Sequence, residues 1–370
     1  MHIAPFSLER WQSVFEHHTE INLSESGVHP LRVSDLVAPG DLEPLLAQEL
    51  GYTQTNGTLA LRERIAALYH NASASNVLVT NGSSEANFVA CWHLLEPGDE
   101  AVIVKPVYEQ ITGLTESFGA TVHSVWLKPD GAGWRPDLDD LRRAVGPRTR
   151  FIAVCNPNNP TGARLDASDV AELARLASEH GCWLLADEVY RGSELDGRDT
   201  PTAWDTYDRV LVTGGLSKAY GLPGLRIGWL IGPPTLIELL WGRRDYTSIA
   251  PGAINDRLAR VALEPTRRTQ LLARTRRILN ENQTRVADWV ATQTAAHQIP
   301  PEAGGVTLIG YAGSDASTGV TERLRTEHGV LCVPGSHFGL DHSLRIGIGG
   351  PPAPLVDGLA RLGHVMDTFA

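Results

Sequence analysis

Residues 216–228 read L-S-K-A-Y-G-L-P-G-L-R-I-G, and they directly follow an apolar run at residues 209–213 that is typical of a strand. Lys218 stands here among glycines and apolar residues, unlike the lysines of a solvated surface. Partial burial lowers the pKa of a lysine and makes its amine nucleophilic. The segment therefore predicts a reactive lysine just beyond the end of a strand.

A second polar segment, Gly82-Ser83-Ser84, stands between a strand expected at residues 76–80 and a helix expected to begin at Ser83. Free backbone N–H groups and the helix dipole at such a start favour a bound phosphate. A serine at this position is also a common N-cap that binds no ligand. Both roles for Ser83 and Ser84 remain open at this point.

Two further polar segments follow apolar runs at residues 150–155 and 182–186. The first, N-P-N-N-P-T-G at residues 156–162, contains two prolines and a glycine, which fix an irregular loop that either aims an amide at a ligand or serves only as a turn. The second contains Asp187, whose carboxylate at the end of a buried strand needs a partner. A protonated ring nitrogen of a bound heterocycle would serve, and so would a backbone group or an arginine.

The whole chain alternates apolar strands with amphipathic helices, which predicts an α/β fold with a mostly parallel central sheet. Further strands are expected at residues 101–104, 121–127 and 226–231, and helices at 59–69, 137–145 and 166–179. We expect an N-terminal arm with part of a small domain at 1–40, a large domain at 41–265, a connecting helix at 266–295 and a smaller α+β domain at 296–370. Ligands of open α/β sheets bind beyond the carboxyl ends of the strands, where the polar segments stand.

Composition excludes several classes of function. The chain has 370 residues and a formal net charge of -11, which disfavours binding to nucleic acid or to an anionic membrane. No N-terminal signal and no membrane-spanning run is visible, so we expect a cytoplasmic protein. The four cysteines are far apart and lack metal-type spacing, which predicts buried reduced thiols and no metal site: Cys91, Cys155, Cys182 and Cys332.

Taken in this order, the four segments resemble the pyridoxal phosphate (PLP) enzymes of fold type I, the aspartate aminotransferase superfamily, over about residues 20–360. The resemblance implies an aminotransferase fold with a large domain and a smaller α+β domain, and PLP as the cofactor. Lys218 would form the Schiff base with PLP and move protons at the substrate carbons. Asp187 would pair with the pyridine nitrogen and keep it protonated.

The same resemblance assigns the remaining residues of the site. Asn159 and Tyr190 would donate hydrogen bonds to the phenolic oxygen of the ring, and Tyr108 would stack on it. The phosphate would be held by Ser83, Ser84 and Arg226, with Ser217 as a substitute for the Ser or Thr that many relatives carry where this chain has Gly215. Arg345 would bind the substrate α-carboxylate, with Gly27 and Asn159 beside it.

Tyr52, in G-Y-T-Q-T-N-G at residues 51–57, matches a tyrosine that reaches the phosphate of the neighbouring subunit. The resemblance therefore implies a homodimer that shares its active sites. The small-molecule partner implied is an amino acid.

Peripheral segments resemble one branch of the family, the enzymes of capreomycidine synthase type. They are S-G-V-H at residues 26–29, G-G-V-T at 304–307 and H-G-V-L-C-V-P-G at 328–335. This branch implies β- or γ-elimination and replacement with ring formation, in specialised amino-acid metabolism. His29 would then protonate a leaving group or move a second proton, unless it is an exposed or structural histidine.

The sequence leaves one alternative function open and disfavours another. The segments N-N-P-T-G at residues 158–162 and D-E-V-Y at 187–190 keep the ordinary aminotransferase form, which leaves plain transamination between an amino acid and a 2-oxo acid as the alternative. A non-catalytic PLP-binding regulator would need an N-terminal DNA-binding domain and a less acidic chain, so we do not expect one.

Overall fold

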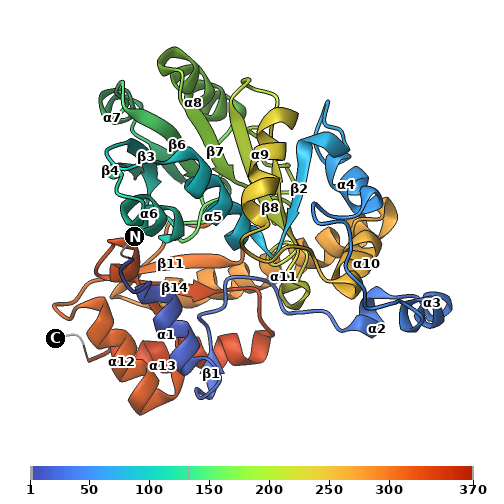
Figure 1. Ribbon diagram of the computed structural model, residues 1–370. Helices are drawn as coiled ribbons and strands as arrows, with labels where there is room; N and C mark the ends of the chain where they lie inside the picture. Colours follow the sequence, from blue (N-terminus) through green and yellow to red (C-terminus); the bar gives the residue numbers. More distant parts are fainter. Residues whose placement is uncertain (1–2, 132, 369–370) are drawn as a thin grey trace.

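The computed structural model describes residues 3–131 and 133–368 and contains a large and a small domain (Figure 1). The large domain is built on an eight-stranded sheet of order β2-β9-β8-β7-β6-β3-β4-β5. The strands are β2 (Val77–Thr80), β3 (Glu100–Lys105), β4 (Thr121–Asp130), β5 (Gly133–Pro136), β6 (Thr149–Cys155), β7 (Trp183–Asp187), β8 (Val210–Gly215) and β9 (Gly228–Ile231). The five strands from β8 to β4 run parallel, whereas β9, β2 and β5 pair antiparallel with their neighbours. The predicted α/β fold with a mostly parallel sheet is confirmed.

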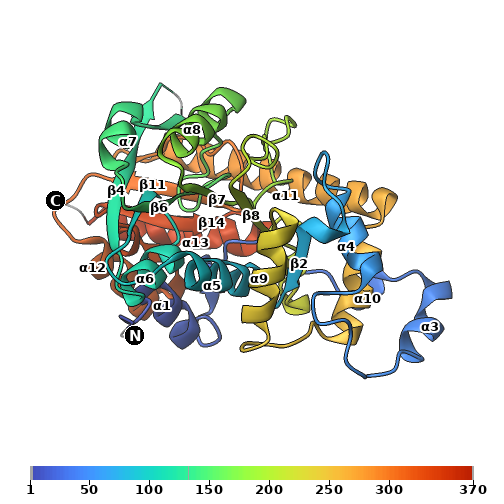
Figure 2. The same cartoon turned by 45° about the horizontal axis from the view of Figure 1, so that its top comes forward.

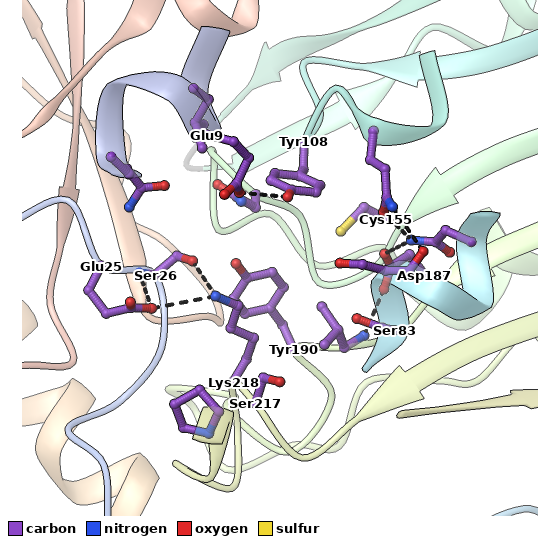
Figure 3. Close-up of a pocket in the computed structure, with 18 of the residues that line it drawn as sticks. Glu9, Glu25, Ser26, Ser83, Tyr108, Cys155, Asp187, Tyr190, Ser217 and Lys218 are labelled. Carbon is purple, nitrogen blue, oxygen red and sulfur yellow. Dashed lines mark hydrogen bonds and ion pairs between the residues drawn. The ribbon is translucent and has the colours of Figure 1, made fainter. Parts of the chain in front are cut away.

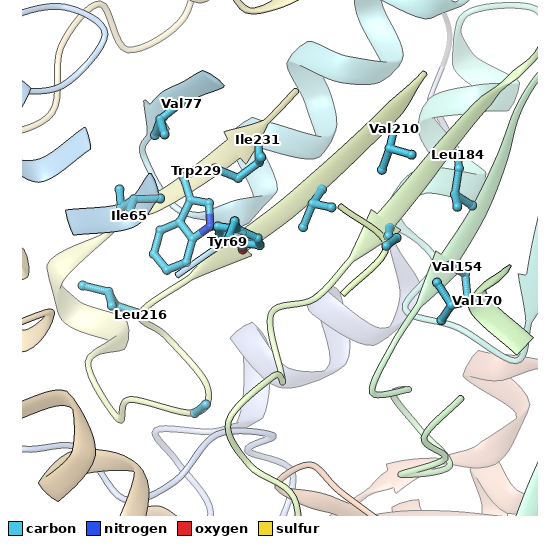
Figure 4. Close-up of a cluster of buried hydrophobic side chains, with 14 of the residues drawn as sticks. Ile65, Tyr69, Val77, Val154, Val170, Leu184, Val210, Leu216, Trp229 and Ile231 are labelled. Carbon is cyan, nitrogen blue, oxygen red and sulfur yellow. The ribbon is translucent and has the colours of Figure 1, made fainter. Parts of the chain in front are cut away.

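Both faces of this sheet are buried except at its β4–β5 edge, which is why the other strands read as continuous apolar runs. Alternate side chains of each strand enter two separate cores. One face is covered by α5 (Ser83–Leu94), α6 (Gln110–Ser117) and α9 (Pro234–Arg244). The other face packs on α4 (Leu59–Ala66), α7 (Leu138–Ala144), α8 (Ala167–His180) and α10 (Ala253–Ala262), and Figure 4 shows part of that core.

The small domain contains an antiparallel sheet of order β10-β11-β14-β13. Its elements are β10 (Ala296–His297), β11 (Val306–Tyr311), α12 (Ser317–His328), β12 (Val330–Leu331), β13 (Val333–Pro334), β14 (Ser343–Gly347) and α13 (Pro352–Met366). Strand β1 (Ile21–Asn22) pairs with β12, so the N-terminal segment is part of this domain. Helix α11 (Pro265–Thr292) joins the two, since Leu272 lies in the core of the large domain and Val286 in that of the small domain.

Three short N-terminal helices have different surroundings. Helix α1 (Ser7–Phe15) lies against the small domain, where Leu8 packs on Val333 and Phe338 (Figure 1). Helices α2 (Val33–Leu36) and α3 (Leu42–Leu46) belong to a segment, residues 33–52, that projects from the large domain, as Figures 1 and 2 show. We call it the projecting segment. This projection was not predicted from the sequence. In the described part of the chain, no helix has the length and apolar character needed to cross a membrane.

Candidate active site

A cavity of about 300 Å³ opens at the carboxyl ends of β6, β7 and β8, beneath α1 and the small domain (Figure 3). Strands β6 and β7 end at Cys155 and Asp187, and Lys218 follows β8 by three residues. Parallel strands meet at one edge of the sheet, and this is the physical reason the polar segments converge. Ten of the predicted site residues line the cavity: Ser83, Ser84, Tyr108, Asn159, Asp187, Tyr190, Ser217, Lys218, Arg226 and Arg345.

The Lys218 amine lies near the middle of this cavity (Figure 3). Its Nζ donates a hydrogen bond to Ser26 Oγ at 2.8 Å and lies 3.4 Å from Glu25 Oε1. Burial lowers the pKa of Lys218, but the neighbouring Tyr190 hydroxyl and Glu25 carboxylate act in the opposite direction, and the net effect raises it. The prediction of a lowered pKa is therefore wrong, because it considered burial alone and not Tyr190 and Glu25, which the fold brings to the amine.

Asp187 is buried at the end of β7, and burial raises the pKa of its carboxyl group. Its Oδ2 accepts a hydrogen bond from Asn87 Nδ2 at 3.1 Å, and its Oδ1 accepts one from the Val189 N–H at 3.1 Å. Two neutral donors and the nearby charge of Lys218 only partly offset the cost of burying this carboxylate, so the site favours a positively charged ligand group. A protonated pyridine nitrogen meets this need.

A cradle for an anion lies at the start of α5. Gly82 has φ 79°, and a Cβ there would come within 2.4 Å of the Arg226 guanidinium. Arg226 itself is in the left-handed region with φ 49°, a strained conformation that is common at ligand sites. Gly228 packs so tightly that its Cβ would lie 2.3 Å from the backbone nitrogen of Ser83. These contacts bring the N-terminus of α5 and a guanidinium together, as a phosphate requires.

Arg345 on β14 is a buried guanidinium without a carboxylate partner among the described residues. It donates from Nη1 to Asn159 Oδ1 at 3.2 Å and from Nη2 to the Ser24 carbonyl, while its Nε has no hydrogen-bond partner among residues 3–131 and 133–368. Burial lowers its pKa. An unpaired buried cation requires an anion, which suits a substrate carboxylate. The bond to Asn159 also orients that amide, so that its N–H group is left to donate to a ligand.

Two tyrosines, Tyr190 and Tyr108, also line the cavity. Tyr190 is buried, and burial raises its pKa. The Tyr108 hydroxyl donates to Glu9 Oε1 at 2.6 Å, which ties α1 to the large domain across the cavity (Figure 3).

Three predicted residues do not line the cavity in the described chain. Gly27 lies directly behind Lys218, since a Cβ there would be 3.6 Å from Lys218 Cδ. His29 has an exposed side chain, and only its backbone is held, by Gly349 and Arg274. Tyr52 is 90% exposed, on the projecting segment. A role for His29 or Tyr52 stays a prediction.

Sequence reasoning missed several residues that line this cavity, among them Glu9, Gln12, Glu16, Glu25, Ser26 and Asn87. Asn87 lies one helical turn after Ser83 on α5, so helical spacing from the predicted anion site was a usable signal. Nothing local pointed to the others, because they reach the cavity from the N-terminal segment.

Comparison with known proteins identifies the group to which these features belong. The family model for aminotransferases of class I and II matches residues 47–362. The chain belongs to this family. It is therefore a PLP-dependent enzyme of fold type I, and the Asp187 carboxylate, the cradle at α5 and the unpaired Arg345 fit that cofactor and an amino acid.

Among characterised relatives, the chain is 36% identical to capreomycidine synthase from Streptomyces vinaceus, over 98% of this chain and 94% of that protein. It is 28% identical to an arginine–pyruvate transaminase from Pseudomonas aeruginosa, over 87% and 84% of the two chains. Among solved structures, a PLP-dependent aminotransferase from Streptococcus suis 89-1591 superimposes with a TM-score of 0.94 at 32% identity, covering 100% of this chain and 99% of that one. The PLP-dependent cyclase OrfR does so with a TM-score of 0.89 at 27% identity, with 100% and 99% coverage.

Proposed function

We propose that this enzyme holds PLP as a Schiff base on Lys218 and catalyses β- or γ-elimination and replacement with ring closure on an L-amino acid that has a cationic side chain. One observation carries the first part of the proposal. A single cavity contains a lysine amine, a buried carboxylate, an anion cradle and an unpaired buried guanidinium. Such a set has a place for the aldehyde, the ring nitrogen and the phosphate of the cofactor, and for the substrate carboxylate.

Each side chain has a definite task in this proposal. The bound cofactor supplies an electron sink next to the substrate nitrogen. Asp187 keeps the ring nitrogen protonated, and Ser83, Ser84 and Arg226 hold the phosphate. Arg345 binds the α-carboxylate and thereby fixes the substrate Cα next to Lys218, whose amine removes the Cα proton.

The charges that line the cavity support a cationic side chain. Glu9, Glu16 and Glu25 all line it, and Gln12 lies between the first two on the N-terminal segment. Three carboxylates around one cavity favour a guanidinium or ammonium group and disfavour acidic side chains. The names of two relatives agree with this: one is an arginine transaminase, and the other forms capreomycidine.

Elimination with ring closure is supported by the 36% identity to capreomycidine synthase along nearly the whole chain, together with the S-G-V-H segment at residues 26–29.

Transamination is the second candidate function. Favouring it are the aminotransferase form of the loops at residues 156–162 and 187–190 and the 32% identity to an aminotransferase structure.

The two reactions leave different products after one turnover. A transaminase leaves the amino group on the cofactor as pyridoxamine phosphate and releases a 2-oxo acid. An elimination and cyclisation enzyme regenerates PLP and releases a cyclic amino acid. We would mix the holoenzyme with one equivalent of arginine or of 3-hydroxyarginine and quantify both cofactor forms and products by mass spectrometry. Stoichiometric pyridoxamine phosphate and oxo acid from both amino acids would rule out the first proposal.

Two variants test the assignments within this assay. Lys218→Met removes the amine, so borohydride should no longer fix PLP to the protein at position 218. Glu9→Gln removes one of the three carboxylates that line the cavity, and we expect KM for arginine to rise more than KM for citrulline, its neutral analogue. Equal effects on both amino acids would contradict recognition of a cationic side chain.

We further propose a homodimer in which Tyr52 reaches the phosphate of the partner subunit. Tyr52 lies on the projecting segment with 90% of its side chain exposed, although it is large and aromatic. A second copy of the chain would cover it.

A further inference from the structure

The Glu25 carboxylate is the negatively charged group closest to the Lys218 amine, at 3.4 Å from Oε1 to Nζ (Figure 3). Its position is fixed, because Oε1 also accepts hydrogen bonds from the N–H groups of Ser26 at 2.8 Å and Gly27 at 2.9 Å. The backbone behind it is held to β14, where the Gly347 N–H donates to the Leu23 carbonyl at 2.7 Å. The carboxylate is therefore built into the site as firmly as the lysine.

Four titratable groups face the amine from the elements around it. Glu25 comes from the N-terminal segment, Asp187 and Tyr190 from β7 and the loop after it, and Arg345 from β14. Arg345 opposes the lysine charge, and Asp187 has its own task at the ring nitrogen. Glu25 is left as the carboxylate that touches the reacting nitrogen.

We propose that Glu25 is the counter-ion of Lys218 whenever the lysine is not bonded to the cofactor, and that Ser26 sets the direction of its amine. The inference rests on the proposed Schiff-base role of Lys218. It adds a residue that contacts the reacting atom and that the cofactor motifs do not contain.

The proton balance gives Glu25 an electrostatic task. The neutral Lys218 amine takes the proton from the substrate Cα: the C–H bond breaks, its electron pair stays on the substrate, and an N–H bond forms. The resulting ammonium later gives the same proton to the leaving group or to another acceptor. The positive charge of Lys218 lowers the pKa of Glu25 to about 2, so its carboxylate stays ionised and exchanges no proton in this cycle. It stabilises the ammonium between the two transfers.

Solvent screening limits how far Glu25 can shift the pKa of Lys218. About half of the Glu25 side chain is exposed, at 53%, while the Lys218 side chain is 26% exposed. An opposite charge at this distance shifts a pKa by about one to three pH units. Because solvent screens this pair, we expect the Lys218 pKa to shift by about one pH unit.

The test measures how fast the lysine in the apoenzyme captures added PLP as a function of pH, by stopped-flow absorbance. Only the neutral amine reacts, so the midpoint of the profile reports the pKa of Lys218. In Glu25→Gln we expect the midpoint to fall by about one pH unit, so that capture at pH 8 becomes about tenfold faster. Glu16→Gln is the matched control for this midpoint, because Glu16 lines the same cavity but pairs with His17 and not with the lysine, and the variant should keep the wild-type midpoint.

The outcomes separate this inference from the proposed function. A wild-type protein that forms no Schiff base at position 218 would refute both. A wild-type protein that forms it, with an unchanged midpoint in Glu25→Gln or the same shift in Glu16→Gln, would refute the role of Glu25 alone. If Glu25→Gln does not fold, Glu25→Asp decides: its shorter carboxylate should lower the midpoint by a smaller amount, and an unchanged midpoint would refute the role.

Discussion

At the scale of single residues, a second buried carboxylate, Glu188, directly follows Asp187 in the chain but does not line the cavity. Glu188 accepts hydrogen bonds at Oε1 from Thr202 and from the Ala203 N–H, while its Oε2 has no hydrogen-bond partner in the described part of the chain. Burial raises its pKa from 4.5 to about 7. Arg191 at 3.9 Å offsets the burial only in part.

This residue predicts a pH-dependent stability. Between pH 4.5 and about 7 the folded protein keeps the Glu188 proton while the unfolded chain loses it, so stability declines as pH rises through this window. The contribution present below pH 4.5 and lost above pH 7 is at most about 3 kcal/mol. Urea unfolding of the apoprotein at several pH values should show a smaller decline in Glu188→Gln than in the wild type. The exposed Glu238→Gln is the control, and parallel profiles for the wild type and Glu188→Gln would contradict the prediction.

At the scale of elements, the contact between β9 and the start of α5 builds the phosphate cradle. A Cβ at Gly228 would lie 2.3 Å from both the Gly82 carbonyl carbon and the Ser83 nitrogen. Backbone atoms cannot move aside as the end of a flexible side chain can. Gly228→Ala must therefore push the start of α5 away from β9. We expect the dissociation constant for PLP, from absorbance titration, to rise at least about tenfold, which is the loss of one charge-assisted hydrogen bond of about 1.4 kcal/mol. Gly224→Ala, whose Cβ would have no atom within 4 Å, should bind PLP as the wild type does.

A second contact ties β9 to the segment after α4. Trp229 Nε1 donates to the Tyr69 hydroxyl at 3.0 Å inside the core (Figure 4). Trp229→Phe removes the donor and leaves that hydroxyl oxygen buried without it, which we expect to cost about 1–3 kcal/mol of unfolding free energy. The measurement is denaturant unfolding of Trp229→Phe, Tyr69→Phe and the double variant. Because both single variants break the same bond, the double variant should lose less than their sum; strict additivity would show that the bond contributes nothing.

At the scale of the whole molecule, the projecting segment exposes apolar side chains that a monomer would leave in water. Leu46, Leu50 and Tyr52 are 78%, 80% and 90% exposed. Their burial against a second copy would favour association. We therefore predict a dimer by light scattering after size-exclusion chromatography, and a monomer for Leu46→Glu combined with Leu50→Glu. Val356→Glu alters an exposed residue of α13 and should stay dimeric, whereas a monomeric wild type would contradict the dimer.

The sequence by itself determined the large-domain sheet and most of the cofactor site. Apolar runs bounded by glycine, proline and polar residues are local signals, and they predicted β6, β7 and β8 to within two residues at each end. Once a parallel sheet is inferred, its geometry requires that Asp187, Asn159 and Lys218 meet at one edge. The other predicted residues that line the cavity were assigned through the family resemblance, and one of them, Arg345, lies on β14 in the small domain.

Only the tertiary structure decided what surrounds the reacting nitrogen. Glu25 and Lys218 are 193 positions apart, and Arg345 and Asn159 are 186 apart. The packing of the N-terminal segment and of β14 against the large domain creates these contacts, and no periodicity or turn signal encodes such packing. The direction of the Lys218 pKa also depends on the fold: burial lowers this pKa, but Tyr190 and the Glu25 carboxylate, which lies 3.4 Å from the amine, raise it.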